Sequence, residues 1–319
     1  MNWTPTTEDS ARIYRKLRTI RRVEEEIARI YPSDKIKSPV HLSIGQEGIA
    51  VGICDALNPD DVVAPTYRGH AAYLAKGGDL DAMFAEFYGK SAGCGTGKAG
   101  SMHLIDIEQG VLGASAVVGT TIPIAMGYAL ALEREGKGRV AVAFFGDGAT
   151  EEGVFYESLN FAALHKLPLL FVCENNFYAI HTPIEKRWAT RRLCERVETF
   201  GIPARLIEDS DTFAIRKTAA GFIAAMRGGA GPAFMECHAY RWREHVGPAE
   251  DYDAGYRGRA ELEPWLQRDP VEAAGRRLGA AVRSDIDTTV EARVASAIEF
   301  AENAPWPTPE DLLTHAYAL

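Results

Sequence analysis

The sequence predicts an α/β fold with a mainly parallel sheet and helices on both faces. Two apolar stretches carry this prediction, RVAVAFFG (139–146) and LPLLFVCENN (167–176), and between them EGVFYESLNFAALHK (152–166) has the length of a helix of about four turns. Strand, helix and strand in this order form a βαβ unit, and strands that are apolar along their whole length are typical of a parallel sheet buried on both faces. PAFMECHAY (232–240) offers a further strand.

The remaining segments predict helices and loops around this unit. Apolar residues recur at steps of three and four between Asp9 and Ile30, which predicts an amphipathic helix. We expect further helices at 47–57 and 120–136, a short strand within 62–70, and an ordered, ligand-facing loop in the glycine-rich stretch 89–119. A long loop (241–265) and surface helices follow. No repeat or low-complexity linker divides the chain, so residues 1–319 are expected to form a single domain with helical N- and C-terminal flanks.

Composition excludes several classes of protein. With 319 residues, 46% of them hydrophobic, the chain can bury a large core. Its net charge of −9 disfavours nucleic acid and acidic membranes as partners. The five cysteines lack any CxxC spacing and are expected to be reduced. The N-terminal residues lack the continuous apolar stretch of a signal peptide, and the sequence has no long apolar segment. These features predict a cytoplasmic protein.

The loop GDGATEEG (146–153) ends the first predicted strand and suggests three kinds of site. A dinucleotide fingerprint needs glycine at its sixth position, where this chain has Glu151, and a Walker loop needs GK[ST], which is missing. A plain turn in which Asp147 caps the following helix remains an alternative.

A metal site is the third kind, and the second strand favours it. Parallel strands of a βαβ unit end at the same edge of the sheet, so Asp147 should lie close to Asn175 and Asn176. Carboxylate, amide and main-chain oxygens are ligands that Mg²⁺ prefers. The metal would hold a diphosphate, and amides around Gly148 and Ala149 would donate to its oxygens. GDG, 26 further residues (149–174) and then NN closely resembles the thiamin diphosphate motif.

The resemblance extends over nearly the whole chain. It rests on HLSIGQE, TYRGH, GKAGSMH, VVGTTIPIAMG, GDGATEEG, ALHKLPLLFVCENNFYA and YRWREH. Together these stretches resemble the alpha subunit of the thiamin diphosphate-dependent first component of 2-oxo acid dehydrogenase complexes, in the pyruvate and acetoin dehydrogenase branch. The fold that this implies is the diphosphate-binding domain of the thiamin diphosphate-binding fold.

The resemblance also implies roles for individual residues. Mg²⁺ would be bound by the side chains of Asp147 and Asn176 and the main-chain carbonyl of Tyr178. His41 and His245 would lie at the reaction centre. Residues that would contact the cofactor, by side chain or main chain, are Tyr67, Arg68, Ala116, Val118, Gly146, Asp147, Gly148, Ala149, Asn176, Arg241 and His245.

Three positions need separate comment. Glu244 stands where the family usually has glycine, and it could narrow the entrance for a lipoyl arm. Val246 replaces a regulatory serine of some animal members, so phosphorylation is not expected there. Glu151, together with the glutamate that follows it, is expected to stabilise the N-terminus of the next helix electrostatically.

The resemblance further implies a reaction and partners. Thiamin diphosphate acts as an electron sink in carbon–carbon bond cleavage. In two-chain members the glutamate that activates its pyrimidine ring comes from a beta subunit, and no segment here resembles that domain. We therefore expect an assembly of two alpha and two beta chains that decarboxylates a 2-oxo acid such as pyruvate, or cleaves acetoin, and passes the acyl unit to a lipoyl acyltransferase. Carboligation to an aldehyde or ketone, such as a sugar, and a non-catalytic binding role remain as alternatives.

Overall fold

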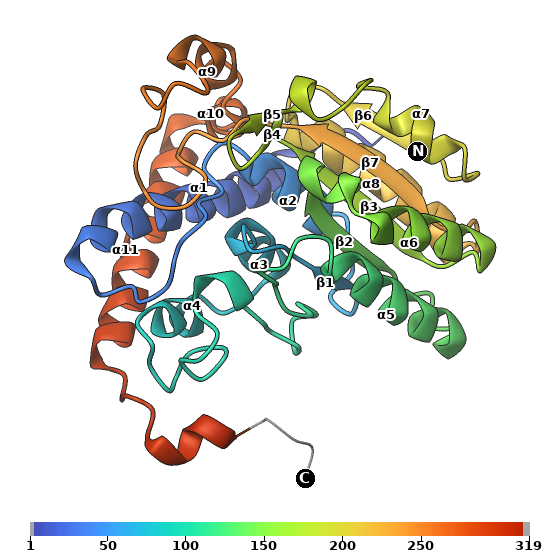
Figure 1. Ribbon diagram of the computed structural model, residues 1–319. Helices are drawn as coiled ribbons and strands as arrows, with labels where there is room; N and C mark the ends of the chain where they lie inside the picture. Colours follow the sequence, from blue (N-terminus) through green and yellow to red (C-terminus); the bar gives the residue numbers. More distant parts are fainter. Residues whose placement is uncertain (1–2, 315–319) are drawn as a thin grey trace.

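The central element of the fold is a parallel sheet. The computed structural model describes residues 3–314, and within them five strands pair in the order β1-β2-β3-β7-β6 (Figure 1). Every pairing in this sheet is parallel. The α/β prediction is therefore confirmed, and the strands are β1 (Val62–Ala64), β2 (Ala141–Gly146), β3 (Leu169–Asn175), β6 (Ala204–Ile207) and β7 (Ala233–His238).

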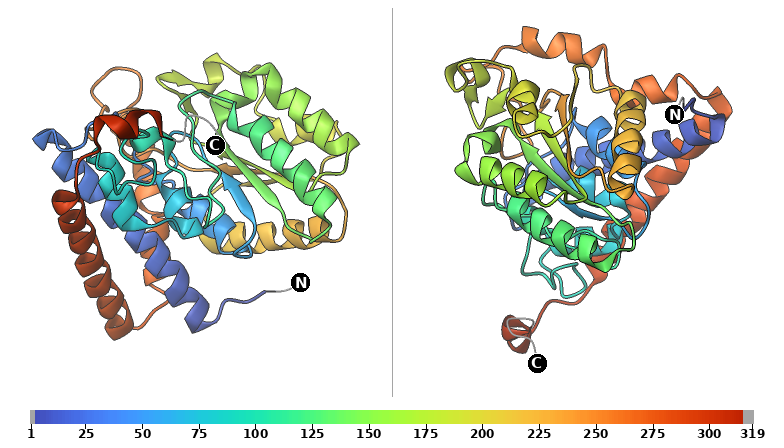
Figure 2. Two further views of the ribbon diagram at one scale, coloured as in Figure 1. Left: turned by 90° about the horizontal axis from the view of Figure 1, so that it is seen from below. Right: turned by 90° about the vertical axis from the view of Figure 1, so that its right-hand side faces the viewer.

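Alternate residues of each strand pack into separate cores on the two faces. In β2, Val142 and Phe144 belong to one core, whereas Ala143 and Phe145 belong to the other. This alternation follows from the two-residue period of a strand, and it explains why both strands of the βαβ unit are apolar throughout. On one face lie α5 (Thr121–Glu135), α6 (Gly153–Leu164) and α7 (Leu193–Glu198); on the other lie α2 (Glu47–Cys54), α3 (His70–Lys76) and α8 (Thr212–Arg227) (Figures 1 and 2).

Two long helices from opposite ends of the chain pack together beside the sheet. The predicted N-terminal helix is α1 (Thr7–Ile30), which begins with a capping box between Thr6 and Asp9. It lies against α11 (Ala280–Asn303), and the Tyr14 hydroxyl donates a 2.7 Å hydrogen bond to Asp287 (Figure 1). Three further helices complete the chain: α4 (Leu80–Phe87), α9 (Arg259–Leu266) and α10 (Pro270–Gly275). Because α9 begins at Arg259, the predicted loop over 241–265 is too long.

The carboxyl edge of the sheet carries several short segments. A 3-10 turn (Asp147–Glu151) follows β2, and a two-stranded hairpin of β4 (Tyr178–Ala179) and β5 (Thr182–Pro183) follows β3. The glycine-rich stretch 89–119 reaches the same edge, where Thr66 pairs with Ser115. A C-terminal 3-10 turn (Pro309–Leu313) lies at the periphery of the molecule, where Lys98 of the glycine-rich stretch donates to the Asp311 carbonyl (Figures 1 and 2). Within residues 3–314, no helix combines the length and the apolar character needed to cross a membrane.

Candidate functional site

A cavity of about 250 Å³ opens at the carboxyl edge of β2 and β3. Ligands of open α/β sheets bind at this edge. The lining includes most of the residues that the sequence predicts for the site, namely Tyr67, Arg68, Val118, Gly146, Asp147, Gly148, Ala149, Asn176, Tyr178 and His245. Segments that are far apart in the chain therefore meet around one cavity.

Asp147 lies directly after β2 and is almost completely buried, with 1% of its surface exposed. Removal from water raises the pKa of this carboxyl group, and an ion pair with Arg187 acts in the opposite direction. The guanidinium of Arg187 also pairs with Glu151. A buried carboxylate needs such a partner, because an isolated buried charge is strongly unfavourable.

Asn176 follows β3, and both polar atoms of its side-chain amide form hydrogen bonds. Its Oδ1 accepts a 3.2 Å hydrogen bond from the Tyr178 main-chain amide, and its Nδ2 donates to Oε1 of Gln46 at 2.9 Å. The intervening Phe177 has φ of 69°, an uncommon conformation for a residue with a side chain. The chain therefore reverses tightly here, which brings Asn176 and the main chain of Tyr178 to the same cavity.

Arg68 connects the cavity to a cluster of aromatic rings. Its guanidinium donates to the carbonyls of Leu42 (2.8 Å) and His245 (3.1 Å), and its Nη2 lies 3.3 Å from Nδ1 of His245. The His41 ring lies 5.1 Å from that of His245 and 4.6 Å from that of Tyr67, measured between ring centroids. Burial lowers the pKa of Arg68 to about 10, which leaves this group charged at neutral pH.

The two histidines of this cluster are neutral. Burial, assisted by the charge of Arg68, lowers the pKa of both His41 and His245 to about 3. His41 does not itself line the cavity, but within residues 3–314 its buried Nδ1 has no hydrogen-bond partner. Such a nitrogen is available to a ligand, which suits the predicted position at a reaction centre.

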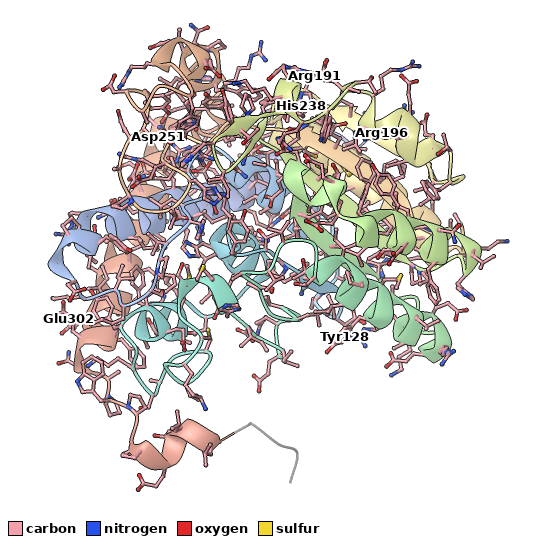
Figure 3. All side chains as sticks on the ribbon, viewed as in Figure 1. Tyr128, Arg191, Arg196, His238, Asp251 and Glu302 are labelled. Carbon is pink, nitrogen blue, oxygen red and sulfur yellow. The ribbon has the colours of Figure 1, made fainter. Side chains whose placement is uncertain are left out.

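Two predicted cofactor contacts, Arg241 and Ala116, are not part of the cavity lining. The buried guanidinium of Arg241 donates to the carbonyl of Arg243 (2.9 Å), to the Tyr256 hydroxyl (2.7 Å) and to Asp251 (3.3 Å). Asp251 lies on the long loop between β7 and α9 (Figure 3). Ala116, also predicted, is flanked by two lining residues, Ser115 and Val117. Contacts of Arg241 and Ala116 with the cofactor remain predictions.

The structure differs from the sequence prediction at the end of β2. The α-helix itself begins at Gly153, in agreement with the predicted range 152–166, but a 3-10 turn precedes it. Glu151 belongs to that turn, where it pairs with Arg187 and accepts a 3.1 Å hydrogen bond from the Trp188 indole. Its main contacts are thus with the segment after β5 and not with the start of α6.

The side chain of Glu244 contacts its own segment of the chain. Its carboxylate accepts a 2.8 Å hydrogen bond from the main-chain amide of Ala249, and its own amide donates to the Ala249 carbonyl at 2.9 Å. The side chain thus closes its own turn and is not part of the cavity lining. The side chain therefore shapes the segment that carries His245, and the narrowing of an entrance stays a prediction.

Sequence reasoning missed several polar residues of the site, four of which carry ionisable or amide groups. Gln46, Glu152 and Glu174 line the cavity, and Arg187 contacts Asp147. Gln46 could have been found, because it belongs to the quoted stretch HLSIGQE. Glu174 directly precedes the two asparagines, and burial raises its pKa to about 7. No sequence signal marks Arg187, since its role depends on how the chain folds after β5.

The donor set of the cavity fits a magnesium–diphosphate group. Asp147 provides a carboxylate, Asn176 an amide oxygen and Tyr178 a main-chain carbonyl, all oxygen ligands of the kind that Mg²⁺ takes. Residues 3–314 contain no cluster of three or more His, Cys, Asp or Glu side chains arranged for a metal. The predicted site needs no such cluster, because a diphosphate would complete the coordination. The main chain of Gly148 and Ala149 and the charge of Arg68 also face this space.

The comparisons with known proteins agree on one family. The dehydrogenase E1 component family matches residues 15–310. The alpha subunit of acetoin:2,6-dichlorophenolindophenol oxidoreductase from Cupriavidus necator is 40% identical, over 96% of this chain and 93% of that protein. Its Bacillus subtilis counterpart is 36% identical, over 98% and 94%. The pyruvate dehydrogenase E1 component subunit alpha of Zymomonas mobilis is 37% identical, over 97% and 88%.

Proposed function

The chain belongs to the dehydrogenase E1 component family, and from this premise we propose that it is the alpha subunit of a thiamin diphosphate- and Mg²⁺-dependent 2-oxo acid or acetoin dehydrogenase. The enzyme decarboxylates a 2-oxo acid such as pyruvate, or cleaves acetoin, and passes the acyl unit to a lipoyl group. The observation that carries this proposal is the meeting of Asp147, Asn176 and Arg68 around one cavity at the carboxyl edge of the sheet.

In this proposal, different residues of the cavity bind the metal and neutralise the diphosphate. Asp147, Asn176 and the Tyr178 carbonyl would hold Mg²⁺, and the bound metal would balance part of the charge of the diphosphate. Arg68, fixed by two main-chain carbonyls, neutralises charge that one divalent ion leaves over. When bound, thiamin diphosphate supplies the electron sink for cleavage of the bond next to a carbonyl.

His41 and His245 move protons at the reaction centre. Because both imidazoles are neutral, each ring offers one N–H that can donate a hydrogen bond and one nitrogen that can accept one. Their T-shaped contact and the hydrogen-bonding distance from His245 to Arg68 keep the rings in fixed positions. A substrate carbonyl or hydroxyl can therefore find a neutral donor and acceptor without first discharging an imidazolium.

A beta subunit completes the enzyme in this proposal. The relatives named above are alpha subunits, which implies a second chain. We propose an assembly of two alpha and two beta chains in which the beta chain contributes the pyrimidine-activating glutamate. Apolar side chains exposed around the cavity, such as Val117 and Ile180, suit a covered surface. A lipoyl acyltransferase is the further partner, and a cytoplasmic location stays a prediction.

Reconstitution with the beta chain tests the reaction. The two chains together, with thiamin diphosphate and Mg²⁺, should reduce 2,6-dichlorophenolindophenol with acetoin or with pyruvate, and should acylate lipoamide. The alpha chain alone and the Asp147→Ala assembly are the controls and should do neither. Failure to reduce the dye or acylate lipoamide, combined with conversion of an added aldehyde to an acyloin, would replace the dehydrogenase by a carboligase.

A further inference from the structure

Asp147, the proposed metal ligand, forms an ion pair with Arg187. Arg187 donates to Asp147 through Nη2 and to Glu151 through Nη1, and its Nε donates to the Thr182 carbonyl at 3.0 Å. All three guanidinium nitrogens thus have partners. The side chain is 93% buried, since only 7% of its surface is exposed. A buried guanidinium whose nitrogens are all hydrogen-bonded differs from a surface ion pair, whose side chains are exposed to water.

The segment that carries Arg187 is rigidly attached to the core. The main-chain amides of Arg187 and Trp188 both donate to the Ile184 carbonyl, at 3.0 and 2.8 Å. Ile184 is 1% exposed and packs in the same core as Phe145 of β2. The position of the guanidinium is therefore set by a packed turn, which makes it suitable for holding another side chain in place.

Arg187 approaches Asp147 from outside the cavity. The cavity lining includes Asp147 but, within residues 3–314, not Arg187. The guanidinium bonds to Oδ2, one of the two carboxylate oxygens. The guanidinium therefore contacts the carboxylate without being part of the cavity lining.

We infer that Arg187 is a positioning residue for the metal-binding carboxylate. By holding Oδ2 of Asp147, it orients the carboxylate toward the cavity and balances its buried charge. This inference rests on the proposed cofactor site and deepens it. A diphosphate bound to one Mg²⁺ keeps a net negative charge, so a fixed cation beside Asp147 favours binding of the metal and the diphosphate together.

Arg187 pairs with Glu151 as well as with Asp147, and the two carboxylates differ in their exposure to water. One guanidinium serves two carboxylates, and Glu151 also accepts from Trp188. Glu151 is 41% exposed at its side chain, whereas Asp147 is buried. Loss of Arg187 would consequently affect Asp147 most, because Glu151 retains access to water and to the indole.

The test measures how binding depends on the metal, not only turnover. In the assembly with the beta chain, thiamin diphosphate binding is titrated by calorimetry at a series of Mg²⁺ concentrations, and bound Mn²⁺ is followed by electron paramagnetic resonance with the cofactor present. Arg187→Gln should raise the metal concentration at half-saturation by about tenfold or more, the usual effect of removing a partner of a metal ligand. Arg187→Lys should lie between this variant and the native enzyme, because an ammonium lacks the fork that serves two carboxylates.

Arg192→Gln is the matched control. Arg192 is an exposed arginine on the same segment that pairs with the exposed Glu195, and its loss should leave the metal dependence unchanged. Asp147→Ala separates this inference from the proposed function. Unchanged binding in Asp147→Ala rejects the metal site itself, whereas loss in Asp147→Ala together with unchanged or tighter binding in Arg187→Gln overturns only the role of Arg187. If Arg187→Gln fails to assemble, Arg187→Lys decides: affinity equal to the native value overturns the role.

Discussion

Nδ2 of Asn176 donates a 2.9 Å hydrogen bond to Oε1 of Gln46, a residue 130 positions earlier in the chain. Both side chains are buried, and both line the cavity. The contact ties the segment before α2 to the turn after β3. It also identifies Nδ2 as the donor end of the amide, so that the Asn176 oxygen accepts from the Tyr178 amide and, in the proposed site, is the atom that would coordinate a metal.

Replacement of Gln46 should therefore weaken cofactor binding. In Gln46→Ala the Asn176 amide loses its acceptor and is free to rotate, so we expect a loss of about tenfold in Mg²⁺-dependent affinity for thiamin diphosphate. Calorimetric titration of the assembled enzyme measures this. An affinity unchanged from the native enzyme would show that the hydrogen bond does not orient Asn176.

The neutral histidines predict a dependence of stability on pH. The pKa of His41 and of His245 is about 3 in the folded protein, below the 6.5 of an exposed imidazole. As the pH falls below 6.5, the unfolded chain binds protons that the folded chain does not, so stability is lost progressively between pH 6.5 and about 3.

A variant with both rings replaced tests this dependence. In the cofactor-free assembly, the double variant His41→Gln and His245→Gln should show a smaller fall in melting temperature between pH 7 and pH 5 than the native protein. Equal falls in the two proteins would mean that the imidazoles titrate in the folded state as they do in the unfolded chain.

The hydrogen bonds of Glu86 predict that this residue stabilises the glycine-rich stretch 89–119. Its buried carboxylate accepts main-chain hydrogen bonds of 2.7–2.9 Å from Gly95, Gly97, Ala99 and Gly100. Glu86→Gln replaces one acceptor oxygen by a donor NH₂ that faces two N–H groups. We expect a loss on the order of 3 kcal/mol in the free energy of unfolding.

Denaturant unfolding of native and variant chains measures the effect of Glu86. Asp81→Asn, on the same helix α4 but in a partly exposed pair with Arg293, is the control and should cost about 1 kcal/mol or less. Equal stability of Glu86→Gln and the native chain would show that the stretch is held by other contacts.

Replacement of Glu244 should change the shape of its turn more than it changes the affinity of the enzyme for the cofactor. Glu244→Gly removes the 2.8 Å hydrogen bond to the Ala249 amide. We expect faster proteolysis within 244–249 in the cofactor-free enzyme, with affinity for thiamin diphosphate changed by about twofold or less, because the carboxylate lies outside the cavity lining. Slower cleavage would contradict the role of Glu244 in its turn, and clearly tighter cofactor binding would show that its carboxylate opposes the cofactor.

The sequence alone was sufficient where periodicity or spacing reports directly on structure. Continuously apolar strands predicted the buried parallel sheet, and GDG with the following asparagines predicted which two strand ends meet. The short edge strand β6 (Ala204–Ile207) escaped this reasoning, because two of its four residues are exposed and it is not apolar throughout. The start of α9 at Arg259 was also missed, because a highly charged stretch precedes it.

Side-chain partners brought together by the fold could not be predicted. Arg187 reaches Asp147 only because the hairpin after β3 turns back over the edge of the sheet. The partners of the Arg241 guanidinium, Asp251 and Tyr256, likewise depend on the course of a loop, and its contact with the cofactor stays a prediction. Residue type indicates which chemistry is available, whereas the partner is decided by tertiary contacts.

The central claim is that Asp147 and Asn176 hold a metal-bound diphosphate, and equilibrium binding of thiamin diphosphate to the alpha–beta assembly tests it most directly. The account predicts tight binding that requires Mg²⁺, is abolished by a chelator, and is lost in Asp147→Ala while the assembly stays folded. Binding of equal strength without the metal, or in Asp147→Ala, would contradict it.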